Sequence, residues 1–168
     1  MGDAYMHGAM NMKIIIDTRE QIPLEFEPDI ETCAGTLRAG DYSLAGFTEA
    51  VAIERKELGD FIACCGQERE RFKAELQRLK AYEARAIVIE ADMGQIIQRA
   101  YRSRIKPESV MGSMASWTLR YQVPFILAGD RDGATRFIVA MFRNYLNQLQ
   151  ETQTALMLNM ERASHVQA

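Results

Sequence analysis

Apolar residues recur along this chain with two distinct spacings, which predict a series of strands and helices. Short runs rich in Val, Ile, Leu and Phe, bounded by Gly, Pro or charged residues, are typical of strands. Six segments have this pattern: residues 13–17, 32–37, 41–44, 49–56, 86–90 and 125–127. Ala45-Gly46 separates the third strand from the fourth, so residues 36–56 are predicted to form a hairpin or meander.

Apolar spacings of three and four residues predict helices in the rest of the chain. Gly66 interrupts this spacing, Asp92 is suited to an N-cap, and Pro107 is suited to the first turn of a helix. The predicted helices span residues 58–65, 68–83, 92–101, 107–121 and 131–150. Strands and a hairpin come first and helices then alternate with strands, which predicts an α/β domain with a central mixed β-sheet flanked by helices.

The domain is expected to span residues 13–150, a length suited to one hydrophobic core. Residues 1–12 lack the basic and apolar regions of a secretory signal, and we interpret them as a flexible leader or a vector-derived remnant. Residues 151–168 are polar with scattered methionines, so a helical extension or a loose tail is expected there. No apolar stretch approaches the roughly 18 residues of a membrane-spanning helix.

Composition and charge narrow the classes of function. Hydrophobic residues make up 48% and charged residues 26%, as in ordinary soluble proteins, and the net charge of -3 requires any nucleic-acid contact to come from local basic patches. The three cysteines, Cys33, Cys64 and Cys65, lack the spacing of a zinc site. They indicate free thiols in a reducing compartment, for example a cytoplasmic, nucleoid-associated location.

The candidate chemistry centres on Gly40-Asp41 and Glu54-Arg55-Lys56, with twelve residues between Asp41 and Glu54. In a strand, side chains alternate between the two faces, so Glu54 and Lys56 share one face and Arg55 occupies the other. Two carboxylates and substrate phosphate oxygens are a usual ligand set for Mg²⁺. Lys56 is then placed to orient or polarise the attacking water.

Further charged residues are predicted to converge on this cluster. Asp17 and Glu20 follow the first strand, and Asp60 lies in the first turn of a helix, from which it can reach back towards Lys56. A set of unrelated solvated charges is the alternative, but it leaves the convergence of these groups at one sheet edge as an accident. The chemistry that fits is Mg²⁺-assisted hydrolysis of a phosphodiester bond.

Basic residues outside the cluster are candidates for contact with nucleic acid. Arg69 and Arg71 lie on a helix face with interspersed acids, so a solvated face and a phosphate-binding face are equally consistent with the pattern. A second basic run contains no acid and is the better candidate: Arg99, Arg102, Arg104 and Lys106. The last helix has an unusually wide apolar face, which indicates core packing first and a homodimer interface second.

These residues resemble the nuclease domain of the XPF-type structure-specific endonucleases, which eukaryotic XPF shares with archaeal Hef. The Gly-Asp and Glu-Arg-Lys-x-x-x-Asp motifs of the family are met by Gly40-Asp41, Glu54-Arg55-Lys56 and Asp60. Its Asp-x-Arg-Glu motif is met by Asp17-Thr18-Arg19-Glu20, and its Arg-aromatic pair by Arg71-Phe72. The resemblance covers roughly residues 13–150.

The resemblance implies a restriction-endonuclease-like core, dependence on Mg²⁺ or Mn²⁺, and cleavage of DNA near junctions of duplex and single strand. Carried over by position, the metal ligands or their close support are Asp17, Asp41 and Glu54. Lys56 would orient the water, and the supporting site residues are Glu20, Arg55, Asp60 and Arg71. Because the strand period turns Arg55 away from Glu54, it is expected to brace Asp17 or Glu20 instead.

The family also forms dimers through this domain, which favours a homodimer interface on the C-terminal helices. Many members add tandem helix-hairpin-helix modules, for which the 18 residues after Gln150 are too few. We therefore expect DNA contacts to come from the domain itself, from its dimer or from a partner. The alternatives are a non-catalytic, DNA-binding partner subunit of a nuclease complex, and a nuclease acting on RNA or on any duplex end. Retention of the acidic and basic set favours the enzyme.

Overall fold

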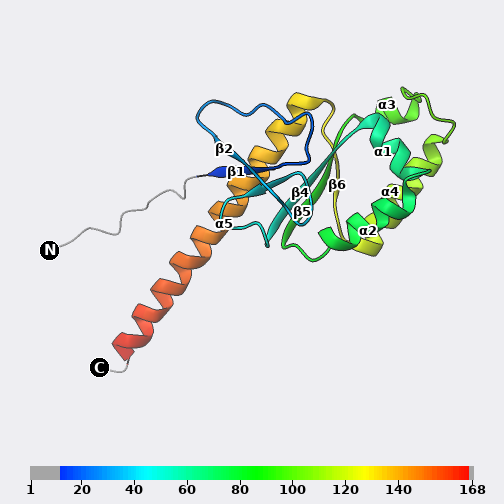
Figure 1. The fold of residues 1–168 in the computed structure, drawn as a ribbon. Helices are drawn as coiled ribbons and strands as arrows, with labels where there is room; N and C mark the ends of the chain where they lie inside the picture. Colours follow the sequence, from blue (N-terminus) through cyan, green and yellow to red (C-terminus); the bar gives the residue numbers. More distant parts are fainter. Residues whose placement is uncertain (1–11, 167–168) are drawn as a thin grey trace.

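A six-stranded mixed sheet forms the centre of the computed structural model, which describes residues 12–166 (Figure 1). Its strands are β1 (Lys13–Asp17), β2 (Glu31–Gly35), β3 (Tyr42–Leu44), β4 (Val51–Glu57), β5 (Ala84–Glu90) and β6 (Phe125–Leu127). The strand order is β2-β1-β3-β4-β5-β6. The predicted α/β class and mixed sheet are confirmed.

The pairing of the strands explains why the sheet is mixed. Strand β3 is antiparallel to both β1 and β4, and Tyr42 lies opposite Ile53, so the predicted hairpin is present. Strand β2 instead pairs in parallel with β1, at the edge of the sheet. It ends at Gly35, two residues before the predicted end, and the backbone N–H of Leu37 instead donates to the Asp17 carboxylate. Strands β4, β5 and β6 are parallel to one another.

Five helices accompany the sheet in the described part of the chain. They are α1 (Leu58–Cys65), α2 (Arg69–Leu79), α3 (Met93–Ile97), α4 (Pro107–Tyr121) and α5 (Arg131–Val166). Asp92 caps α3 with a capping box, and Pro107 opens α4, as predicted. Helix α3 ends at Ile97, four residues before its predicted end, and the positive φ of Arg99 (56°) takes the following residues out of helical geometry.

Two hydrophobic cores lie on the two faces of the sheet. One joins Ala52 and Ile87 to the buried faces of α1, α2 and α4, and the other joins Val51 and Ile53 to α5. Alternate residues of β4 therefore point to different helical layers. This alternation determines the surroundings of the three charged residues that follow Ile53.

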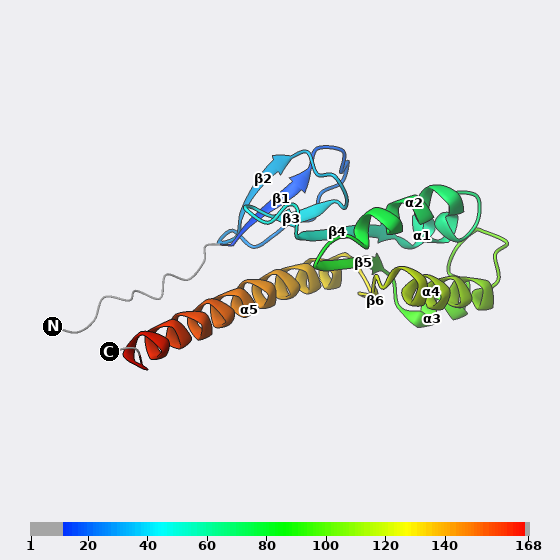
Figure 2. The same ribbon diagram turned by 90° about the horizontal axis from the view of Figure 1, so that it is seen from below.

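Helix α5 continues past residue 150 to Val166, where a helical extension was one of the two expectations. Figures 1 and 2 both show its C-terminal part extending beyond the rest of the domain. Side chains of residues 151–163 are exposed, so this part of the helix adds nothing to the buried core. Residues 1–11 of the expected leader lie outside the described residues. Within the described residues, no helix combines the length and apolar character needed to cross a membrane.

Candidate active site

Gly40 brings Asp41 against the middle of β4. Gly40 has a φ of 76°, and a Cβ atom there would lie 2.8 Å from the carbonyl oxygen of Ile53, so the position requires glycine. The backbone N–H of Asp41 donates to that carbonyl at 2.8 Å. In return, the Asp41 carboxylate accepts a hydrogen bond of 2.8 Å from the backbone N–H of Arg55. These contacts fix the Asp41 carboxylate beside Glu54.

Glu54 and Lys56 project together from β4 and form an ion pair. The side chain of Glu54 is 5% exposed and that of Lys56 is 15% exposed. Helix α2 covers them: Lys56 Nζ lies 3.8 Å from a carboxylate oxygen of Glu75 and 5.9 Å from the ring centroid of Phe72. Glu54 and Lys56 thus share the face that the strand period predicted.

The electrostatics of this cluster favour a bound cation. Burial raises the pKa of Asp41 to about 6. Burial and then the charge of Asp41 raise the pKa of Glu54 well above its ordinary value. Burial lowers the pKa of Lys56, but the charges of Glu54 and Glu75 outweigh it and raise that pKa overall. One ammonium faces three acids, so the site retains excess negative charge.

Arg55 lies on the opposite face of β4, as predicted, and ties three segments together. Its buried guanidinium donates to Glu90 at 2.6 Å and to Glu57 at 3.0 Å, and it lies 3.4 Å from Glu20. Arg131, at the start of α5, lies 3.5 Å from the same Glu90 oxygen. Arg55 therefore braces Glu20, one of the two expected partners, and holds the β1–β2 connection against the end of β5.

Asp17 supports the site from the end of β1. Its buried carboxylate accepts hydrogen bonds from Arg19 Nε and from the backbone N–H of Leu37, each at 2.7 Å. Burial alone would raise the pKa of Asp17, but these donors outweigh burial and lower it. The backbone N–H of Asp17 also donates to the carbonyl of Asp41 at 2.8 Å. Asp17 thus orders the backbone that carries Asp41, and its own carboxylate is already occupied.

Two other predicted site residues, Asp60 and Arg71, lie away from this cluster. The Asp60 side chain is exposed and makes no ion pair with Lys56 among the described residues, because it projects from the first turn of α1 into solvent. Arg71 is 76% exposed and pairs with Glu68 at 2.7 Å. Sequence reasoning placed both close to the chemistry. Their positions give them no direct contact with Lys56, and Arg71 is open to solvent.

The basic residues predicted to contact nucleic acid divide into two groups. Arg69 turns inward, with its guanidinium 4.8 Å from the ring centroid of Trp117 and 2.8 Å from Ser113 Oγ. Its contacts join α2 to α4, so its cation is engaged within the protein. The remaining basic residues are exposed in the α3–α4 connection: Arg99, Arg102, Arg104 and Lys106.

Glu75 and Arg19 belong to the cluster, although the sequence analysis assigned neither to it. Arg19 is paired with Asp17, and the charges of Asp41 and Glu54 add to the increase in its pKa. Glu75 occupies a position on the apolar stripe of α2, between the buried Phe72 and Leu79. The position of Glu75 within an apolar stripe could have indicated that its carboxylate points towards the site. Its neighbouring basic residues, however, made the helix resemble an ordinary solvated face.

The donor set fits a hard divalent cation that keeps part of its water shell. Asp41 and Glu54 could supply oxygen ligands from adjacent backbone segments, and a cation would relieve their mutual repulsion. Among the described residues, no group of three His, Cys, Asp or Glu side chains is arranged to enclose a metal ion. Water or phosphate oxygens would complete the coordination, as is usual for Mg²⁺.

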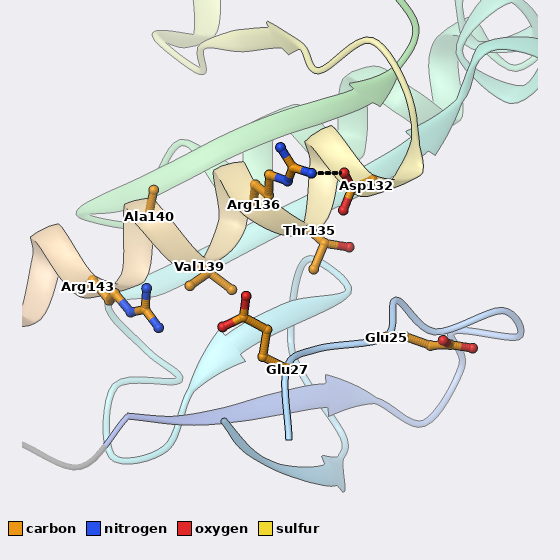
Figure 3. A pocket seen from close by; sticks show the side chains of 8 residues that line it. All are labelled: Glu25, Glu27, Asp132, Thr135, Arg136, Val139, Ala140 and Arg143. Carbon is orange, nitrogen blue, oxygen red and sulfur yellow. Dashed lines mark ion pairs between the residues drawn. The ribbon is translucent and has the colours of Figure 1, made fainter. Parts of the chain in front are cut away.

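A groove of about 300 Å³ lies elsewhere, between α5 and the segment that contains Glu25 and Glu27 (Figure 3). Its lining residues are Glu25, Glu27, Asp132, Thr135, Arg136, Val139, Ala140 and Arg143. Figure 3 shows Arg136 paired with Asp132 along α5. Its charged lining consists of three acids and two arginines, and none of the Asp41, Glu54 and Lys56 side chains lines the groove.

The mixed sheet, its two helical layers and the acidic cluster with its lysine define a restriction-endonuclease-like α/β domain. Among known protein families, the ERCC4 domain matches residues 16–141 of this chain. The chain belongs to the ERCC4 domain family, and the resemblance to XPF-type nuclease domains is confirmed.

The fold is also found in solved structures, of which two illustrate the similarity. One is XPF from Aeropyrum pernix, with 21% identity and a TM-score of 0.63, over 89% of this chain and 73% of that one. The other is XPF from Aeropyrum pernix in complex with DNA, with 23% identity and a TM-score of 0.64, over 82% of this chain and 66% of that one. No curated protein matches the chain.

Proposed function

We propose that this chain is a metal-dependent DNA endonuclease that hydrolyses phosphodiester bonds, preferentially in flaps, forks or other branched DNA. The observation that carries the proposal is the pair of acids, Asp41 and Glu54, beside the Lys56 ammonium on one face of the sheet. The family supports it, and so does the XPF structure solved in complex with DNA.

Asp41 and Glu54 would hold Mg²⁺, with Mn²⁺ able to substitute. The bound ion supplies an activated water and neutralises charge on the phosphate. Lys56 is placed beside both acids, where its ammonium can orient the attacking water or stabilise a phosphate oxygen. The backbone N–H of Arg55 holds one oxygen of Asp41, which leaves the other oxygen of that carboxylate for the cation.

DNA would approach through exposed basic side chains. Arg71 and the α3–α4 residues Arg99, Arg102, Arg104 and Lys106 are exposed, and we assign phosphate contacts to them. Each phosphate contact adds roughly 0.9 to the slope of log affinity against log salt for duplex DNA. Replacing Arg102 and Arg104 with Gln should therefore weaken binding to all sequences and reduce that slope by about 2. An unchanged slope would show that the α3–α4 connection does not contact the DNA phosphates.

A homodimer through α5 is the second part of the proposal. Four large apolar side chains are exposed close together on its C-terminal extension: Leu156, Met157, Leu158 and Met160. A second copy would bury them. Sedimentation equilibrium at micromolar concentration should give a dimer, and Leu156→Glu with Met160→Glu should give a monomer. Leu119→Glu, which changes an 82% exposed residue on α4, is the matched control. A wild-type monomer would refute the interface.

The test of activity uses labelled flap, fork, splayed-arm, junction, linear duplex and single-stranded DNA, with Mg²⁺, Mn²⁺ or EDTA. Cleavage of branched DNA is expected with either metal and is expected to fall by roughly a hundredfold or more in Asp41→Ala and Lys56→Ala. Asp29→Ala and Lys80→Ala change exposed residues of the same types and should retain activity. Cleavage that is undiminished in both site variants would refute the site. DNA binding without cleavage would support the non-catalytic alternative. Cleavage of RNA would show that the proposed substrate class, DNA, has to be revised.

A further inference from the structure

Glu75 gives Lys56 a second acidic partner from a different element. Phe72, Leu76 and Leu79 anchor α2 in the core beneath β4, and Glu75 lies on the same stripe. Its side chain is 20% exposed, and one carboxylate oxygen lies 3.8 Å from Lys56 Nζ. The buried stripe therefore fixes the position of this carboxylate.

The Lys56 ammonium is enclosed on several sides. Glu54 pairs with it from the same strand, Glu75 approaches it from helix α2, and the buried ring of Phe72 lies 5.9 Å away. Cations are attracted both to carboxylates and to the faces of aromatic rings. Helix α2 thus supplies two of the groups that surround this ammonium.

A divalent cation at Asp41 and Glu54 would weaken the ion pair between Glu54 and Lys56. A Glu54 carboxylate that binds the cation attracts the Lys56 ammonium less strongly, and the cation and the ammonium repel each other. Glu75 remains as the paired acid, and its distance from Lys56 already places it within ion-pair range. The helix would keep the ammonium beside the site without engaging the cation directly.

We propose that Glu75 is a positioning residue that holds the Lys56 ammonium in place when Glu54 is engaged by the metal. This inference rests on the nuclease function proposed above. Glu75 acts through Lys56, so removing its charge should impair the chemical step and leave binding of DNA unaltered. Its effect should also depend on the presence of Lys56.

Steady-state kinetics with Mg²⁺ and a branched DNA substrate test this dependence. Glu75→Gln should lower kcat roughly tenfold or more, with KM within about twofold of the wild type. In a Lys56→Met background, Glu75→Gln should cause no further loss beyond about twofold. Glu70→Gln changes an exposed acid on the same helix and should have no effect. Normal kcat in Glu75→Gln, or an equal loss in both backgrounds, would refute the proposal.

A second measurement is independent of cleavage. Urea unfolding of metal-free wild type, Glu75→Gln, Lys56→Met and the double variant should give a coupling of about fivefold in the unfolding equilibrium constant. Additive effects would refute the contact. If the wild type cleaves no substrate, the nuclease function fails while this coupling still decides the pairing of Glu75 with Lys56.

Metal binding separates positioning from direct ligation. Calorimetric titration with Mn²⁺ should show Glu75→Gln within about threefold of the wild-type affinity, whereas Glu54→Gln should lose tenfold or more. A loss in Glu75→Gln equal to that in Glu54→Gln would make Glu75 a metal ligand and overturn the positioning role.

Discussion

Replacing Asp41 with Asn should stabilise the metal-free protein at neutral and alkaline pH. Asn has nearly the same shape as Asp, and its side-chain oxygen can still accept the hydrogen bond from the Arg55 N–H. The substitution removes a negative charge that burial and the neighbouring acids make unfavourable in the folded state. A residue proposed to bind metal therefore costs stability when the metal is absent.

The pKa of Asp41 sets the size and sign of this effect. It rises from 3.8 to about 6 on folding, which corresponds to about 3 kcal/mol of unfolding free energy. The folded protein binds the proton more tightly than the unfolded chain. The cost of the charge is therefore fully present above pH 6, falls between pH 6 and pH 4, and disappears below pH 3.8.

Urea unfolding in EDTA from pH 4 to pH 8 measures the difference between Asp41→Asn and the wild type. The variant should be more stable by about 2 to 3 kcal/mol at pH 8 and by less than about 1 kcal/mol at pH 4. Asp17, whose lowered pKa has the opposite effect, is present in both proteins and cancels in the difference. Added Mg²⁺ should stabilise the wild type more than the variant.

Equal stabilities at pH 8 would refute the assignment of an unfavourable charge to Asp41. A difference that does not vary with pH would instead assign the effect to altered hydrogen bonding with Arg55. Asp29→Asn, a change at an exposed acid, serves as the control and should alter stability by no more than about 0.5 kcal/mol at any pH.

Three further predictions concern the supporting structure. In thermal unfolding, Gly40→Ala should destabilise the protein by roughly 2 kcal/mol, because it combines a positive φ with a backbone clash. Gly59→Ala, where space is open, should be nearly neutral in the same measurement. Arg55→Met should cost about 3 kcal/mol in urea unfolding by leaving buried carboxylates unpaired, whereas Arg38→Met at an exposed pair should cost less than about 1 kcal/mol. Deleting residues 151–168 should leave the unfolding free energy of a monomeric sample within about 0.5 kcal/mol of the value for the full chain, because the described side chains of this segment are exposed. A larger loss would show that the extension stabilises the domain.

Several parts of the fold could be predicted because they depend on local chemistry. The β-branched run of β5 and the apolar stripe of α4 require burial on defined faces, and Asp92 and Pro107 mark helix starts through their own backbone preferences. The alternation of Glu54, Arg55 and Lys56 between two faces follows from strand geometry alone. Helix ends were less predictable, since the end of α3 depends on the conformation of the loop that follows it.

The partners of the charged groups depend on segments that are distant in the chain. Residue spacing identified Asp41, Glu54 and Lys56 as one cluster, because two strands joined by a short turn bring them together. It could not show that α2 turns Glu75 towards Lys56, that Arg69 turns inward to Trp117, or that Asp17 is occupied by Arg19 and Leu37. Local sequence therefore specifies which faces of the strands and helices carry charge. Tertiary packing decides which groups pair with those charges, because a buried charge is stable only beside a counter-charge or a hydrogen-bonding group, and that group can come from any segment of the chain.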